Sequence, residues 1–461
     1  MPKSQKPISR DRLSRIIKKD GAAVHFVGVG GVSMYSLARL SMSAGLSVSG
    51  SDRILGEYAK ELISLGVRVH AGHDSSHAAG ADLVVYSFAI PEDNPELVYA
   101  VENDIPVVSR AEYLGALMKE YKARIGVSGS HGKSTTTALI AEIFIAAGID
   151  PTVAAGASLT SGEPFRRGSD STFVYEACEY KDAFLNFHPT VAVALNLEMD
   201  HPDYFKNLKE LRESFRRALS RAEKFALVNV DDENLSALIK GIKAPVITYG
   251  QGLRSTYRYM ITSFLDHGFV FSVWKHGQRI GDFILNIPGV FNVGNAAAAV
   301  IVALEYGLPL EVIQTAVGSF RGIPRRLEYV GERFGRPVFY DYAHHPTEIA
   351  ASLNAIKLMT HGLVTVVFKL HTYTRTKELW EQFRLSLGIA DYIVVTPIYA
   401  AREEPIHGIS SERLADELGA HARAVDDYEV TAVLDSFTHG AIVIMGAGDM
   451  EQIRHDVLYK P

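Results

Sequence analysis

Short apolar runs alternate with amphipathic stretches along the whole chain, and this alternation constrains the fold more than any other feature. Runs such as 24–28 (VHFVG), 124–128 (RIGVS) and 364–369 (VTVVFK) have the length of buried strands. Helical patterns that end at glycine separate them, as in the helix expected from Ser134 to Gly148. Buried strands alternating with helices predict an α/β fold with parallel, doubly wound sheets.

The alternation forms three arrays, and a chain of 461 residues is too long for one hydrophobic core. We therefore predict a Rossmann-like domain at 1–120, a central ATP-binding domain at 121–324 and a C-terminal Rossmann-like domain at 325–461. Between 246 and 287 the pattern changes to β-rich pieces, with hairpin turns expected at 266–268 and 275–277. Other expected elements are strands at 46–50, 81–90, 106–109, 173–177, 190–197, 225–230, 338–342, 392–396 and 441–445, and helices at 295–306 and 377–387.

Composition excludes several classes of protein. A hydrophobic fraction of 47% excludes a largely disordered chain, and no apolar stretch has the length of a membrane span. A net charge of −6 disfavours broad nucleic-acid binding. The single cysteine, Cys178, excludes an internal disulfide, and the basic N-terminus lacks the apolar core of a signal peptide. We expect a cytoplasmic protein.

The sharpest local motif is Gly-Ser-His-Gly-Lys-Ser at 129–134, between an expected strand and an expected helix. Glycines let backbone N–H groups turn toward phosphate oxygens, and the helix N-terminus adds positive potential. Lys133 would lie along the β- and γ-phosphates, and the Ser134 hydroxyl would ligate Mg²⁺. The common spacing requires a glycine where this chain has Val127, so an ordinary glycine-rich turn remains the alternative.

A second glycine-rich turn, Gly-Val-Gly-Gly-Val-Ser-Met at 28–34, follows the first strand. Asp52 ends the next strand, where a dinucleotide fold places a ribose-binding acid. Ser33 replaces the third glycine of that fingerprint, which leaves a tight turn without function equally open. The functional interpretation is a pocket for a nucleotide diphosphate, of which NAD is one candidate.

Acidic and imidazole groups follow two strands of the central array. Glu176 and Glu179 stand in YEACEY, and Glu198, Asp200 and His201 stand in NLEMDHPDYF. Oxygen ligands at strand ends beside a phosphate loop suit Mg²⁺, which favours Glu176 and His201 as ligands. The alternative is a solvated acidic loop.

In the third array, the segments 341–348 (DYAHHPTE) and 371–376 (HTYTRT) lie where strands become helices. Polar groups at such strand ends face the ligand crevice of an open sheet. The alternative is helix capping by Thr347 or Thr376 with incidental histidines nearby, and for His345 alone we prefer it. Arg325 and Arg326 are either surface charges or phosphate ligands.

Taken together, these segments resemble the Mur ligase family over nearly the whole chain. The resemblance also covers SGSD, PGVFNVGNAAAA, GIPRRLEYVG and YTRTKELWEQF. Its members have a shorter phosphate loop, which accounts for Val127. GVGGVSM and DYAHHPTE are similar to the alanine-adding branch of the family. The resemblance implies an ATP- and Mg²⁺-dependent ligase that joins L-alanine to the lactyl carboxylate of UDP-N-acetylmuramate, without nucleic-acid or membrane partners, as a monomer or weak homodimer.

The resemblance also implies roles for individual residues. Those expected at the UDP-sugar are Gly28, Gly30, Gly31, Ser51, Asp52, Ser87 and Arg110. Those expected at ATP are Gly129, Ser130, His131, Gly132, Lys133, Ser134, Thr135, Asn292, Asn295, Arg326 and Asp341. Those expected at the metal are Ser134, Glu176 and His201, and those at the acyl group and amino acid are His344, His371 and Arg375. The expected catalytic set is Lys133, Glu176, His201, Arg326 and His344.

Three alternatives stay open at this point. The related ligase that recycles murein peptides shares much of this layout. An NAD-dependent dehydrogenase acting on a sugar nucleotide would explain the first glycine turn and Asp52 but not the phosphate loop. A non-catalytic nucleotide sensor has no need of Lys133, Glu176 and His201.

Overall fold

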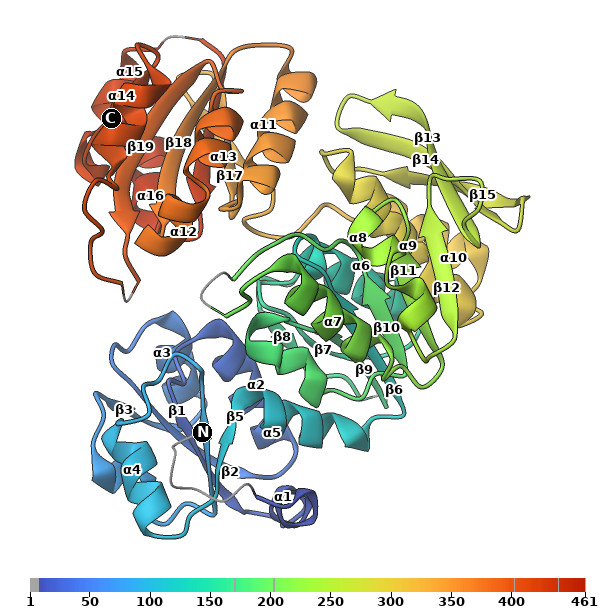
Figure 1. Ribbon diagram of the computed structural model, residues 1–461, viewed down its shortest axis with the longest axis vertical. Helices are drawn as coiled ribbons and strands as arrows, with labels where there is room; N and C mark the ends of the chain where they lie inside the picture. Colours follow the sequence, from blue (N-terminus) through green and yellow to red (C-terminus); the bar gives the residue numbers. More distant parts are fainter. Residues whose placement is uncertain (1–7, 170, 202–203, 402, 438, 461) are drawn as a thin grey trace. The chain divides into compact units, whose positions relative to one another are not determined.

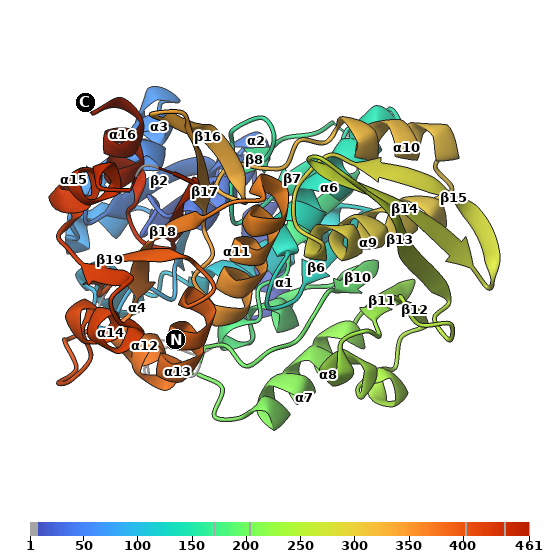
Figure 2. The same cartoon turned by 90° about the horizontal axis from the view of Figure 1, so that it is seen from above.

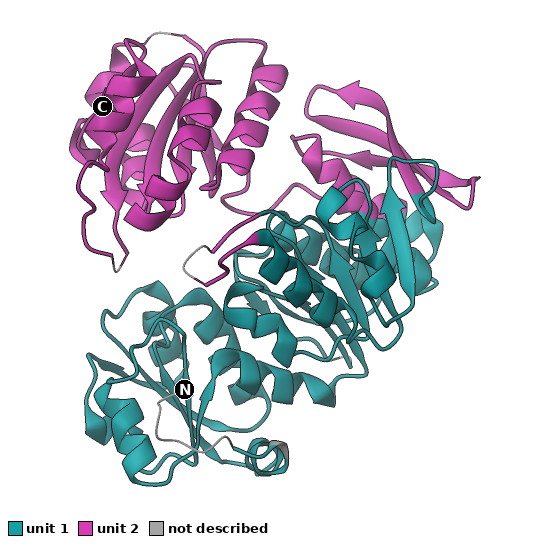
Figure 3. Ribbon diagram, viewed as in Figure 1, with its two compact units in different colours: residues 1–198, 208–257, 298–313 teal, residues 199–207, 258–297, 314–461 magenta. Residues whose placement is uncertain are grey.

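The computed structural model describes residues 8–169, 171–201, 204–401, 403–437 and 439–460. Its elements divide into two compact units (Figure 3). Unit 1 comprises residues 1–198, 208–257 and 298–313, and unit 2 comprises residues 199–207, 258–297 and 314–461. No helix among the described residues has the length and apolar character needed to cross a membrane.

Unit 1 begins with a sheet of which Figure 1 labels β1, β2, β3 and β5. The sheet has five parallel strands, in the order β3-β2-β1-β4-β5. Its strands are β1 (Ala23–Val27), β2 (Ser47–Asp52), β3 (Arg68–Ala71), β4 (Leu83–Tyr86) and β5 (Val107–Ser109). Its α-helices are α1 (Arg10–Ile17), α2 (Val32–Ser43), α3 (Glu57–Ser64), α4 (Pro95–Glu102) and α5 (Arg110–Leu117). The strand expected over 81–90 spans only β4, because Ile90 closes a turn by donating its N–H to Ser87.

The rest of unit 1 is built on the sheet that carries the phosphate loop, in the order β12-β11-β10-β6-β9-β7-β8. Its strands are β6 (Ala123–Ser128), β7 (Thr152–Ala154), β8 (Phe165–Arg166), β9 (Thr172–Glu176), β10 (Val191–Ala194), β11 (Phe225–Asn229) and β12 (Val246–Gly250). Helices α6 (Lys133–Ala146), α7 (Leu208–Leu219) and α8 (Glu233–Ser236) belong to the same array. Strands β9, β6, β10, β11 and β12 are mutually parallel, so their carboxyl ends share one edge.

The expected hairpins of the β-rich segment are present. Strands β13 (Tyr257–Leu265), β14 (Gly268–Lys275) and β15 (Gln278–Leu285) follow one another, and β14 pairs antiparallel with β15. Helix α9 (Phe291–Glu305) starts four residues before the expected Asn295, and α10 (Leu310–Ser319) follows it.

Unit 2 ends with a sheet of which Figure 2 labels β16, β17, β18 and β19. The sheet has six strands, in the order β16-β17-β21-β18-β19-β20. Its strands are β16 (Glu328–Arg333), β17 (Arg336–Asp341), β18 (Val364–His371), β19 (Tyr392–Tyr399), β20 (Ala422–Ala424) and β21 (Ala441–Gly446). Its helices are α11 (Pro346–Thr360), α12 (Tyr373–Glu378), α13 (Trp380–Leu387), α14 (Ser411–Leu418), α15 (Val430–Asp435) and α16 (Glu451–Tyr459). One hydrophobic cluster joins the sheet to α11, α13 and α14, and another joins it to α15 and α16. Both faces are therefore covered, as the doubly wound prediction requires.

One local prediction for this sheet was wrong, and its edge strand was not predicted. Edge strand β16 pairs antiparallel with β17, so the sheet is not wholly parallel. The helix expected over 377–387 is broken at Leu379, which ends α12 and begins α13. No proline or glycine marks this break in the sequence.

Candidate active site

The first glycine turn connects β1 to α2 and is held by the end of β2. Gly28 has φ +85°, a conformation that favours glycine over residues with a side chain. The Ser51 carbonyl accepts the N–H groups of Gly28 (2.8 Å) and Val29 (3.0 Å). The Asp52 carboxylate accepts the N–H of Gly30 at 2.8 Å. Asp52, expected at a ribose, therefore also fixes the shape of the turn.

Two further residues expected at the UDP-sugar lie around this turn. A Cβ atom on Gly28 would lie 3.6 Å from the Cβ of Ser87, which places Ser87 directly beside the glycine. Arg110 is the first residue of α5 and is partly buried. Gly31 is the N-cap of α2, so the N–H groups of the first turn of that helix begin at the glycine segment.

The phosphate loop runs from the end of β6 into α6. Gly129 and Gly132 have φ values of +149° and +82°, and Gly132 is the N-cap of the helix. Asn196, just after β10, supports the loop: its carbonyl accepts the Ser130 N–H at 3.2 Å, and its Oδ1 accepts the His131 N–H at 2.8 Å. The loop therefore rests against the end of the neighbouring parallel strand, at the edge where ligands of open sheets bind.

Lys133 is folded back over this loop. Its ammonium donates to the carbonyls of Gly129 and Ser130, and lies 3.3 Å from both carboxylate oxygens of Glu179. Glu179 is only 2% exposed. The sequence identified Glu179 as an acidic residue but did not place it beside Lys133. The only feature of the sequence that could have indicated this contact is that Glu179 follows Glu176 by three residues.

A small cavity joins the two glycine-rich segments of unit 1. Its volume is about 150 Å³, and its lining includes Ser33 from the first turn, Arg110, Lys133, Glu176 and Cys178. One Glu176 oxygen accepts the Gly156 N–H at 2.6 Å. Burial raises the pKa of the Cys178 thiol, which disfavours a reactive thiolate. The cavity brings a cation from each predicted nucleotide site to one place.

Ser134 and Thr135 complete the loop segment and are both buried. They lie in the first turn of α6, where backbone N–H groups have no carbonyl of the same helix to bond. Such N–H groups attract phosphate.

In unit 2, three residues expected at the acyl group and amino acid lie together. The His344 and His371 rings have centroids 6.0 Å apart, and Arg375 lies 3.4 Å from His371 Nδ1. Burial is the main cause that lowers the pKa of each histidine to about 4, and the Arg375 charge lowers both further. Both imidazoles are therefore neutral near pH 7. Arg375 also donates to Asp200 at 3.0 Å.

The orientation of His344 follows from its partner. Its Nδ1 lies 3.0 Å from the Tyr342 carbonyl, which only accepts hydrogen bonds. Nδ1 therefore carries the proton of the neutral ring, and Nε2 is left as an acceptor. Glu348 accepts the His344 N–H at 3.1 Å.

Asp341 and Arg326, both expected at ATP, lie in the same segment of unit 2. Asp341 is 4% exposed, and burial raises its pKa to about 6 although the Ser352 hydroxyl donates to it. The Arg326 guanidinium lies over the Tyr342 ring at 5.1 Å and 3.9 Å from Glu348. His345 is itself the N-cap of α11 and accepts the Thr347 N–H, and Thr372 is the N-cap of α12, so the expected capping by Thr347 or Thr376 was wrong.

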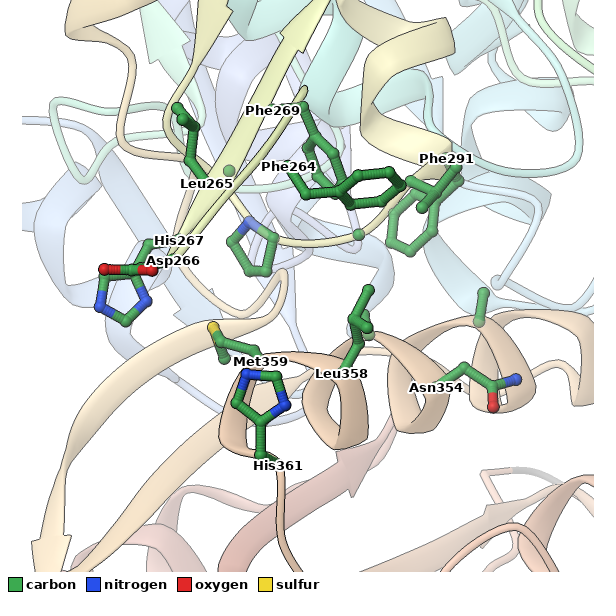
Figure 4. Close-up of a pocket in the computed structure, with 16 residues that line it drawn as sticks. Phe264, Leu265, Asp266, His267, Phe269, Phe291, Asn354, Leu358, Met359 and His361 are labelled. Atoms are coloured by element: carbon green, nitrogen blue, oxygen red, sulfur yellow. The ribbon is translucent and has the colours of Figure 1, made fainter. Parts of the chain in front are cut away.

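Asn292 and Asn295 lie on the first turns of α9 and are both buried. Asn292 donates to the Pro288 carbonyl at 2.7 Å, and Asn295 donates to Asn292 Oδ1 at 3.0 Å. Next to them is an apolar cavity of about 750 Å³ (Figure 4). Its lining includes Phe264, Leu265, Phe269, Val290, Phe291, Leu358 and Met359. Phe291 immediately precedes Asn292, so the asparagine pair lies at the border of this apolar space.

Within each unit, the structure brings most of the expected residues together. In unit 1, Arg110, Lys133 and Glu176 share one cavity. In unit 2, His344, His371 and Arg375 are neighbours. His201, expected with Ser134 and Glu176 at a metal, has φ +55° and lies 3.6 Å from Asp200 within unit 2.

Comparison with known proteins identifies the family. The Mur ligase catalytic domain matches residues 23–122, the Mur ligase middle domain matches 127–303, and the Mur ligase glutamate ligase domain matches 325–450. The chain belongs to the Mur ligase family. The three matches in order also agree with the predicted three-domain α/β architecture.

Individual Mur ligases match the chain along nearly its full length. UDP-N-acetylmuramate–L-alanine ligase of Caldicellulosiruptor bescii is 39% identical over 445 residues, covering 94% of this chain and 98% of the relative. The enzyme of that name from Caldicellulosiruptor saccharolyticus is 40% identical, with the same coverage. The crystal structure of UDP-N-acetylmuramate–alanine ligase from Thermotoga maritima superposes with a TM-score of 0.81 at 28% identity, covering 94% of this chain and 98% of that one.

A murein peptide ligase from Psychrobacter arcticus shares the Mur ligase fold as well. Its TM-score is 0.70 at 23% identity, covering 95% of this chain and 98% of that one. This likeness concerns the fold alone.

Proposed function

We propose that this Mur ligase joins L-alanine to the lactyl carboxylate of UDP-N-acetylmuramate at the expense of ATP, in the synthesis of peptidoglycan precursors. The relatives that carry this name align with nearly the whole chain. The observation that carries the proposal is the cavity shared by Ser33, Arg110 and Lys133. A UDP-sugar on the first glycine turn and ATP on the phosphate loop would both face this cavity.

The proposed reaction has two steps. The lactyl carboxylate attacks the γ-phosphate and gives an acyl phosphate with release of ADP. The amine of alanine then attacks the acyl carbon, and phosphate leaves. Lys133 would leave the Gly129 and Ser130 carbonyls and offset charge on the transferring phosphoryl group. Arg110 would orient the carboxylate from the other side of the cavity.

Mg²⁺ fits the donors at the loop. The Ser134 hydroxyl and the Glu176 carboxylate of unit 1 offer oxygen ligands of the kind that this ion prefers, and they would hold it. The role expected for His201 stays a prediction. When bound, the ion would neutralise phosphate charge. Arg326, Asp341, Asn292 and Asn295 remain the proposed contacts of ATP in unit 2. A planar adenine suits the apolar border beside the asparagine pair.

The neutral histidines of unit 2 give the second step a proton acceptor. The attacking amine of alanine must lose a proton, and His344 Nε2 is an acceptor near pH 7 because its Nδ1–H is used by Tyr342. Arg375 and His371 would hold the carboxylate and methyl side of the amino acid. We expect the enzyme to act in the cytoplasm, as a monomer or weak homodimer.

The test is phosphate release from ATP with UDP-N-acetylmuramate, measured with and without L-alanine. We expect release only when both are present. Release that requires a tripeptide in place of alanine would instead assign the chain to peptide recycling. Glycine and L-serine serve as competing amino acids, because they differ from alanine by one methyl or one hydroxyl group.

A further inference from the structure

Glu96, on the first turn of α4, is a fully buried carboxylate that no proposed contact with substrate uses. One of its oxygens accepts the Ser51 hydroxyl at 2.6 Å and lies 3.1 Å from His25 Nε2. The other lies 3.2 Å from the Nδ1 atoms of His73 and of His77. Four groups thus surround one carboxylate. They come from β1, β2, the segment after β3 and the turn at 75–78.

This environment keeps Glu96 ionised. Burial is the largest single cause and raises the pKa of this carboxyl group, but the hydrogen bonds from His25, Ser51 and His77 and the electrostatic attraction of His25 together outweigh it and bring the pKa of Glu96 to about 2. His25 is itself fully buried, and its Nδ1 lies 2.9 Å from Ser49 Oγ. A buried charge with this many partners has few alternative arrangements, so it fixes the elements that supply them.

The element fixed most directly is the end of β2. Ser51 bonds Glu96 through its side chain, while its carbonyl holds the N–H groups of Gly28 and Val29. The next residue, Asp52, holds the N–H of Gly30. Two adjacent residues of β2 therefore bind three consecutive amides of the glycine turn. The packing is tight here, because a Cβ atom on Gly50 would lie 2.9 Å from Val29.

We propose that Glu96 is a positioning residue: through Ser51 it holds the glycine turn in the shape that receives the UDP-sugar. This inference rests on the proposed function, since it takes the turn to be the UDP-sugar site. Glu96 does not touch the ligand. Its removal changes how well the turn is formed before binding, and so affects UDP-sugar affinity rather than the chemical step.

The test is Glu96→Gln, which keeps the size of the side chain but removes the charge and one acceptor. We expect KM for UDP-N-acetylmuramate to rise about tenfold, because hydrogen bonds to an ionised group are the strong ones. We expect kcat and KM for ATP to change less than about twofold. Glu102→Gln is the matched control, because Glu102 is an exposed residue of the same helix.

Two further measurements separate positioning from a general loss of folding. Nitrogen NMR of the imidazoles should show changed tautomers or shifts at His25, His73 and His77 in Glu96→Gln but not in Glu102→Gln. Ser49→Ala removes the second partner of His25 without touching Glu96, and should raise the same KM by a smaller factor even if Glu96→Gln does not fold.

The outcomes are distinct. If the wild-type enzyme fails to bind UDP-N-acetylmuramate, the proposed function itself is wrong. If the wild type binds it while folded Glu96→Gln keeps its KM, or loses only kcat, the positioning role is overturned. If Glu96→Gln does not fold, an unchanged KM for UDP-N-acetylmuramate in Ser49→Ala would also overturn the positioning role.

Discussion

At the scale of single residues, buried polar groups determine which sites the fold can build. Glu179, Glu96 and Asp341 are all nearly excluded from solvent, and each has partners that fix its environment. Burial alone would raise the pKa of such a carboxyl group. For Asp341 burial prevails and the pKa is about 6, whereas for Glu96 the hydrogen bonds prevail and the pKa is about 2. Two buried carboxyl groups of the same protein therefore differ in pKa because their hydrogen-bond partners differ.

Asp341 gives a prediction for pH dependence. The Ser352 hydroxyl lowers the pKa of Asp341, so Ser352→Ala should raise it above about 6. An ionised carboxylate is the better acceptor for ribose hydroxyls, and ATP affinity should fall as the pH drops through the pKa. The variant should therefore bind ATP at least about threefold more weakly at pH 6.5, with little change at pH 8.5.

The measurement is the dissociation constant of ATP across pH for the wild type, Ser352→Ala and Ser436→Ala. Ser436 is exposed and its hydroxyl donates to the Val433 carbonyl of α15, so its variant reports the titration of ATP itself. If the loss of ATP affinity at low pH is the same in all three proteins, Asp341 does not contact the nucleotide.

At the scale of elements, the two ends of α6 offer a matched pair of glycines. Gly132 precedes the helix with φ +82°, and Gly148 follows it with φ +78°. Alanine at either position is strained, so Gly132→Ala and Gly148→Ala should each lower the free energy of unfolding by about 1 kcal/mol. Only Gly132→Ala should weaken ATP binding, by about tenfold or more, because only Gly132 shapes the phosphate loop.

Denaturant titration measures the free energy of unfolding, and a binding titration measures the ATP affinity. Equal ATP affinity in both variants would contradict the role of the loop.

Sequence periodicity predicted most elements because buried strands and amphipathic helices have local patterns. It did not predict the break at Leu379, since no breaker residue marks it. Partners distant in the sequence were also missed: Glu96 contacts Ser51 and His25, which lie 45 and 71 residues away in the sequence. The motif at 129–134 was recognisable because a phosphate loop is a local structure, whereas its contact with Glu179 depends on the register of β6 against β9.

At the scale of the whole molecule, the proposed substrate contacts are distributed over both units, and those of ATP lie in each of them. Unit 1 carries the glycine turn and the phosphate loop, and unit 2 carries the histidine–arginine group together with Asn292 and Asp341. A ligand that binds only the native state stabilises it by RT ln(1 + [L]/Kd), so the stabilisation grows with the logarithm of the ligand concentration. UDP-N-acetylmuramate and ATP should therefore each raise the thermal unfolding midpoint. At a ligand concentration of a hundred times the dissociation constant, the free energy of unfolding should increase by roughly 2.7 kcal/mol.

Lys133→Ala separates these two contributions. Lys133 bonds loop carbonyls and Glu179, and its proposed partner in the complex is the ATP tail. The variant should fold, lose nearly all turnover, and lose most of the midpoint increase caused by ATP, while the increase caused by UDP-N-acetylmuramate stays close to that of the wild type. Lys119→Ala, at an exposed lysine of unit 1, is the control and should respond as the wild type does. Full stabilisation by ATP together with wild-type turnover in Lys133→Ala would remove the phosphate loop from the proposed reaction. Loss of both midpoint increases would instead show that Lys133 supports the whole cavity rather than the nucleotide.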